Sequence, residues 1–169
     1  KGRDLGDDKV YRTAIHLDEA EPLDAAIDPP AVPQTAVIVA ADGSQIMPDR
    51  HAAFLYYLIN IGGIIYFHGT GDPPQVFTVP TINYPESDEA IASFPESSGQ
   101  VSILRDVEEI GTLVQTAWQH RHQPPVIAIL DQRLLYWPIG DSGSRTGETA
   151  VRKWQTSMTE ARENSTLLV

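Results

Sequence analysis

The chain has 169 residues, of which 41% are hydrophobic, and its 23 acidic residues against 12 basic ones give a formal net charge of −11. This length suits one globular domain with a sizeable core. The acidic balance argues against a protein that coats nucleic acid through Lys and Arg, but it does not exclude a nuclease that meets phosphates through bound cations.

The residue types limit the possible sites and compartments. The chain has no cysteine, which excludes disulfide frameworks, thiolate metal sites and cysteine nucleophiles. Its longest apolar stretch, Phe54–Phe67, is shorter than the roughly 18 residues that a membrane span needs, and no secretory signal is visible. We therefore expect a cytoplasmic protein with no membrane partner, and the start at Lys1 suggests a fragment of a longer protein.

The first half of the chain predicts an arm followed by strands. Residues 1–34 are polar, acidic and interrupted by prolines, which indicates a leading arm. Thr35–Ala41 is a β-branched apolar run that predicts a central strand buried on both faces. Ala52–Phe67 contains Gly62-Gly63 and predicts two antiparallel strands that turn or bulge at the glycines. Gln75–Val79 predicts a further short strand.

The second half alternates helices and strands. Ser87–Ala92 predicts one helical turn, and Val101–His120 has apolar side chains every three or four residues, which predicts a longer helix. Val126–Leu130 predicts a second buried strand, Glu148–Asn164 a second helix and Thr166–Val169 the start of another strand. This order predicts an α/β fold in which helices flank a mixed sheet.

Two of the predicted core strands end in an aspartate. Asp42 follows the first apolar run, in the stretch AVIVAADGSQI, and Asp131 follows VIAIL. Because ligands of open α/β sheets bind at the carboxyl ends of strands, two such carboxylates favour a functional site. The alternative for Asp42 by itself is an Asp-Gly turn or a cap on the next segment.

The predicted helix between these strands adds a third carboxylate. Glu108 and Glu109 lie on opposite flanks of the apolar stripe at roughly 100° per residue, so only one of them can border the sheet. Together with Asp42 and Asp131, a helix glutamate would complete an oxygen-only cage suited to Mg²⁺ or Mn²⁺. Such a cage can hold two ions for phosphodiester cleavage. For each glutamate alone, a solvated helix face is the alternative.

Four stretches in a fixed order carry a family resemblance. They are ADGSQIMPDRHAAFLYYLINIGGIIYFHG (Ala41–Gly69), ILRDVEEIGTLVQTAW (Ile103–Trp118), PPVIAILDQRLLYW (Pro124–Trp137) and the terminal TEARENSTLLV. Over residues 35–169 the chain resembles the NurA family of DNA-repair nucleases. The resemblance implies an RNase H-like nuclease domain over residues 35–169 that is incomplete at its C-terminus, because the family's later tyrosine and histidine follow a segment like TLLV.

The resemblance also implies an activity and a set of ligands. It implies an Mn²⁺-dependent (or Mg²⁺-dependent) 5′ to 3′ exonuclease and single-strand endonuclease that acts on DNA with a HerA-like hexameric translocase, as a homodimer. Asp42 resembles the family's first-strand metal ligand and Asp131 its fourth-strand ligand. Glu109 resembles the helix carboxylate, with Glu108 as the competing register.

Two arginines are candidate DNA contacts. Arg50 stands where the family has a loop arginine, and Arg133 is expected to line the path of the DNA. The chain departs from the family at Gln132, where a glycine usually follows the strand-end aspartate.

Two other functions stay open from the sequence. One is a non-catalytic NurA-like module that docks a DNA translocase and has lost cleavage. The other is an ATP-handling enzyme with an actin-like fold, whose first strand also ends in Asp-Gly, although its adenosine-site glycine motif is not visible in this sequence.

Overall fold

The chain divides into two compact units, residues 1–32 and 33–169. In the part of the first unit that is described, no residue belongs to a helix or strand. All of the described helices and strands lie in the second unit. The computed structural model describes residues 26, 28–49, 51, 53–91, 94–95, 97–136 and 145–169.

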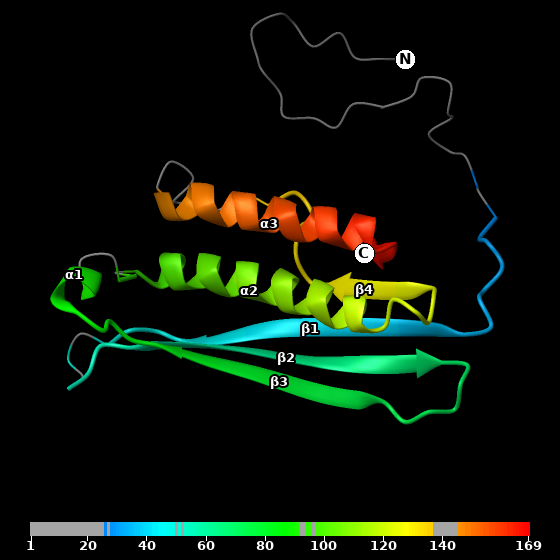
Figure 1. Cartoon of the computed structure of the whole chain (residues 1–169), viewed down its shortest axis with the longest axis horizontal. Coiled ribbons are helices and arrows are strands. Elements are labelled where there is room, and N and C mark those ends of the chain that lie inside the picture. Colours follow the sequence, from blue (N-terminus) through cyan, green and yellow to red (C-terminus); the bar gives the residue numbers. More distant parts are fainter. Residues whose placement is uncertain are drawn as a thin grey trace, which may run out of the picture. The chain divides into compact units, whose positions relative to one another are not determined.

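Among the described residues, five strands and three helices follow one another along the second unit (Figure 1). The strands are β1 (Ala36–Ile46), β2 (Tyr57–His68), β3 (Gln75–Asn83), β4 (Val126–Leu130) and β5 (Thr166–Leu168). The helices are α1 (Asp88–Ile91), α2 (Ser98–Gln119) and α3 (Arg145–Glu163). The prediction of an α/β fold with a mixed sheet is confirmed.

The five strands form one sheet in the order β3-β2-β1-β4-β5. β2 runs antiparallel to both β1 and β3, whereas β1, β4 and β5 run parallel to one another. The chain leaves β1 for β2 and β3 on one side, and β4 and β5 add on the other side. The carboxyl ends of β1 and β4 are therefore the point at which the strand order reverses, where open α/β sheets bind their ligands.

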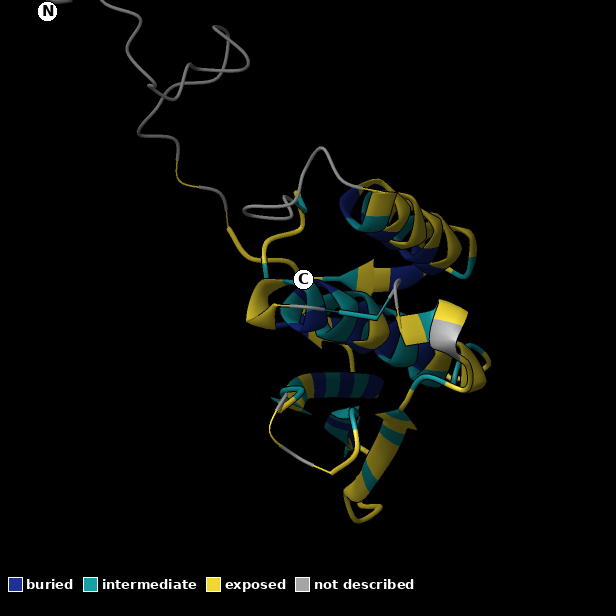
Figure 2. Ribbon diagram, turned by 90° about the vertical axis from the view of Figure 1, so that its left-hand side faces the viewer, coloured by how far each residue is buried: buried dark blue, intermediate teal, exposed yellow. Residues whose placement is uncertain are grey.

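Helices α2 and α3 pack on the same face of the sheet (Figures 1 and 2). The strand side chains beneath them alternate with residues of the other face, as pleated strands require. The core between the sheet and the helices contains Val37, Val39, Ala41, Ile59, Ile61, Val126, Ala128, Ile110, Leu113 and Trp154. Burial of these apolar side chains is the main reason why α2 packs against the strands.

The opposite face of the sheet is not covered by any helix of the described residues. Ile64, Tyr66 and Ile129 point to this face and are between 40% and 45% exposed. Ile38 on β1 is half-buried. The prediction that the first strand is buried on both faces is therefore wrong for the described part of the chain.

The glycine pair of β2 does not divide it into two strands. The register with β1 and with β3 continues through Gly62 and Gly63 without a break. Gly63 lies under the Phe77 ring of β3, and a Cβ atom on it would also come within 2.6 Å of the Ala40 carbonyl oxygen. The sequence-based prediction of a turn failed because Gly63 provides space for a close approach of Phe77 inside a continuous strand.

We expect Gly63→Ala to lower the free energy of unfolding by about 1–3 kcal/mol, because the added methyl group overlaps Phe77 and the β1 backbone. Urea unfolding followed by circular dichroism measures this change. The control is Gly62→Ala, where no atom lies within 4 Å of the added carbon. Equal losses for the two variants would contradict the assignment of Gly63 to the helix-covered face.

Candidate metal site where strands β1 and β4 separate

Strand β1 continues beyond Asp42. Asp42 pairs with Gly62 of β2, and the strand runs on to Ile46. The turn and cap alternatives for Asp42 are therefore wrong. The pairing of β1 with β4, in contrast, ends at Ala41 and Leu130. We call the residues that follow this last pair, Asp42 and Gly43 on one side and Asp131 and Gln132 on the other, the β1–β4 fork.

The fork leaves the backbone amide of Gly43 without a strand partner. The Val37 N–H donates to the Pro125 carbonyl at 3.0 Å, and amides two residues apart in a strand point the same way. The Gly43 N–H therefore points toward β4, where the Asp131 carbonyl would be the next acceptor. Instead, the Gly43 N–H donates to Glu109 Oε2 at 3.0 Å.

Glu109 reaches the fork from helix α2 and is only 2% exposed. Its approach depends on glycine, because a Cβ atom at position 43 would lie 2.8 Å from Glu109 Oε2 and 2.7 Å from Arg105 Cγ. Glu108, the competing register, is exposed. Of the two glutamates, the structure therefore places Glu109 against β1.

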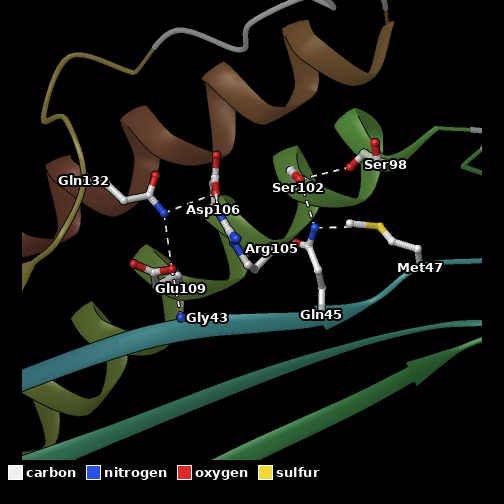
Figure 3. A network of polar contacts seen from close by, with 9 residues as sticks. All are labelled: Gly43, Gln45, Met47, Ser98, Ser102, Arg105, Asp106, Glu109 and Gln132. Atoms are coloured by element: carbon white, nitrogen blue, oxygen red, sulfur yellow. Dashed lines mark hydrogen bonds and ion pairs between the residues drawn. The ribbon is translucent and has the colours of Figure 1, made fainter.

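A polar network fixes the Glu109 carboxylate from the other side of the fork (Figure 3). The Gln132 side-chain amide lies 3.2 Å from Glu109 Oε2 and 3.2 Å from Asp106 Oδ1. Asp106 Oδ1 also accepts a hydrogen bond from Arg105 at 2.7 Å. A glutamate, an aspartate and an arginine of one helix are thereby joined to the segment that follows β4.

Helix α3 anchors this segment. The Trp154 ring N–H donates to the Leu134 carbonyl at 3.1 Å, and the Tyr136 ring stacks on Trp154 with a centroid distance of 4.4 Å. Burial raises the pKa of the Tyr136 hydroxyl, and the nearby Asp106 charge raises this pKa further. The segment from Asp131 to Tyr136 thus contacts α2 through Gln132 and α3 through Leu134 and Tyr136, which limits how far Gln132 can move.

The surroundings of Glu109 raise the pKa of its carboxyl group. Burial raises its pKa, and the Asp42 charge also raises it, against the lowering effects of Gln132, Arg105 and the Gly43 amide. Its second oxygen, Oε1, is buried and has no hydrogen-bond partner within the described part of the chain. A buried carboxylate oxygen without a partner is unfavourable, and either a proton or a cation relieves this cost.

Asp42 and Asp131 each begin one branch of the fork, and both are exposed. Strand alternation directs the Asp42 side chain to the face opposite α2, since Gly43 faces Arg105 and Glu109. Arg133 is exposed. Arg50 lies outside the described residues.

Within the ranges that the structure describes, no three His, Asp or Glu side chains converge closely enough to hold one ion. Asp42, Glu109 and Asp131 thus share the fork through their backbone positions or contacts, but their side chains do not close into a cage. Such a set fits Mg²⁺ or Mn²⁺, which proteins often bind through one or two carboxylates, while water and substrate phosphates supply the remaining oxygens. The unpartnered Glu109 Oε1 is the observation that supports this fit.

Sequence reasoning missed three members of this network. Arg105 and Asp106 were part of a charged helical run whose inward residues could not be assigned from periodicity alone. Gln132 was noted only for standing where a glycine was expected. Its place directly after the strand-end aspartate was the available signal.

Comparison of the chain with protein-family models, with curated proteins and with solved structures finds no match. The helices of the described residues include none that is both long and apolar enough to cross a membrane.

We expect Glu109→Gln to stabilise the protein near pH 7 in metal-free buffer, because the amide removes a buried negative charge while its oxygen can still accept the hydrogen bonds from Gly43 and Gln132. The folded-state pKa of Glu109 lies above its ordinary value of 4.5. The stability that this proton contributes is therefore present below pH 4.5 and is lost as the pH rises through the folded-state pKa.

Urea unfolding of wild type and variant across this pH range measures the difference. Glu108→Gln is the matched control, since Glu108 is exposed on the same helix. A difference between wild type and Glu109→Gln that is constant with pH would contradict the buried position of this carboxyl group.

Proposed function

We propose that the chain is a metal-dependent DNA nuclease with an RNase H-like fold, related to the NurA family and acting in the cytoplasm. The observation that carries this proposal is the buried Glu109 carboxylate at the β1–β4 fork, with one oxygen unpartnered and an aspartate on each branch. The carboxylates come from the first strand, a covering helix and the end of the fourth strand. This is the order in which the resemblance assigns metal ligands.

The proposed ligands of Mn²⁺ or Mg²⁺ are Asp42, Glu109 and Asp131. Glu109 is the rigid member, because the Gly43 amide and Gln132 hold its Oε2. Asp42 and Asp131 are exposed and so are accessible to a phosphodiester substrate. A bound divalent ion supplies an activated water and neutralises charge that develops on the leaving oxygen.

In this proposal, the DNA passes close to the exposed residues of the β1–β4 fork. Arg133 is exposed two residues after Asp131 and is the described base nearest in sequence to the proposed ligands. Arg50 is proposed as a second phosphate contact. Basic side chains of this kind position the DNA backbone without reading its sequence.

The proposed partners are DNA, a HerA-like hexameric translocase and a second copy of the chain. The second candidate function is a non-catalytic module that docks such a translocase. The uncovered face of the sheet favours this candidate, because Ile64, Tyr66 and Ile129 are exposed there and exposed apolar patches mark interaction sites. Carboxylate-dependent binding of Mn²⁺ separates the two candidates.

In the full-length protein we expect degradation of single-stranded DNA in the presence of Mn²⁺, and we expect Asp42→Asn and Asp131→Asn to lower its rate by about 100-fold or more. Loss of a residue that hydrogen-bonds to a metal ligand typically lowers metal affinity or activity by about 10–100-fold. Loss of the ligand itself should lower them at least as much. A gel assay with end-labelled DNA measures the rate.

Asp72→Asn is the matched control, because Asp72 is exposed in the turn between β2 and β3. Its rate should equal that of wild type. Undiminished cleavage by Asp42→Asn would overturn the ligand assignment. Calorimetry that detects no carboxylate-dependent binding of Mn²⁺ would favour the docking module instead.

A further inference from the structure

Gln132 has an unusual place in the polar network. Its side-chain nitrogen lies at the same distance, 3.2 Å, from an oxygen of Asp106 and an oxygen of Glu109. An amide NH₂ group has two hydrogens to donate. One hydrogen is thus available for each carboxylate, and Gln132 bridges two acidic side chains of α2.

This bridge makes the two oxygens of Glu109 unequal. Oε2 accepts hydrogen bonds from the Gly43 amide and from Gln132. Oε1 is buried and has no partner among the described residues. The carboxylate is therefore held through one of its two oxygens only.

The far end of the bridge is also fixed. Asp106 accepts a hydrogen bond from Arg105 at 2.7 Å, and both side chains are partly buried. The side chains of Arg105, Asp106, Gln132 and Glu109 therefore form a continuous chain that ends on the Gly43 backbone (Figure 3). Rotation of the Glu109 carboxylate would break two hydrogen bonds at once.

We propose that Gln132 is a positioning residue that orients Glu109 so that Oε1 faces the divalent cation. This inference rests on the proposed function, since it concerns the same site. Outer partners of this type fix the orientation of a metal ligand, and their loss typically weakens metal affinity.

The competing explanation is that Gln132 only links the segment after β4 to α2. The chain provides a matched control for this explanation. The Gln45 side-chain amide donates to Ser102 Oγ at 2.9 Å and so links β1 to the same helix, without contact to a carboxylate. If Gln132 only links the two elements, replacing either glutamine should lower the stability of the protein by a similar amount and leave Mn²⁺ binding unchanged.

The test compares Gln132→Met with Gln45→Met, since methionine keeps the length of glutamine but has no N–H donor. Calorimetric titration of each purified variant with Mn²⁺ measures affinity, and urea unfolding in metal-free buffer measures stability. We expect Gln132→Met to weaken Mn²⁺ binding by about 10–100-fold. Gln45→Met should bind Mn²⁺ as wild type does.

The same titration of wild type and Glu109→Gln separates this inference from the proposed function. Equal Mn²⁺ binding by wild type and Glu109→Gln would overturn the metal site, and the positioning role with it. If Glu109→Gln loses binding while Gln132→Met keeps it, only the positioning role is overturned. An equal loss of affinity in Gln132→Met and Gln45→Met also overturns it, because such a loss is structural.

Discussion

The hydrogen bond from the Gly43 amide to the Glu109 carboxylate is the contact on which the candidate site depends. A parallel ladder between β1 and β4 ends after Ala41 and Leu130, and a strand amide left at such an end needs another acceptor. Here a helix side chain supplies the acceptor at 3.0 Å. The same contact brings the Glu109 carboxylate of α2 against the β1 backbone, directly after the last residue pair of β1 and β4.

Glycine at position 43 and the course of α2 determine this contact together. α2 lies across β1 because its apolar stripe, including Ile110 and Leu113, packs on the covered face of the sheet. Glu109 directly precedes Ile110 of that stripe and is itself only 2% exposed, so the packing of α2 also carries its carboxylate to β1. A side chain at position 43 would fill the space that the carboxylate occupies. Core packing and the chemistry of the site are therefore not independent in this part of the fold.

Much of the fold was predictable from local patterns, whereas the site was predictable only in part. β4 matches the predicted Val126–Leu130, and α2 starts three residues earlier than predicted because the Ser97 side chain caps it at the Gln100 amide. The single strand β2 was missed, since Gly63 makes room for a residue of a third strand that the local sequence does not reveal. The role of Gln132 depends on contacts with a helix more than twenty residues away in sequence, which no periodicity encodes.

The acidity of the chain and the burial of Glu109 would both be compensated by a cation bound at the candidate site. A net charge of −11 opposes the approach of a phosphodiester, and the fork adds Asp42, Glu109 and Asp131 at the place where the proposed substrate would bind. The Asp42 charge and burial both make an ionised Glu109 less favourable. A divalent cation at Glu109 Oε1 would remove both difficulties, because it compensates the buried carboxylate and presents positive charge to the phosphate. In the proposed nuclease, stability and substrate binding would therefore depend on the same ion.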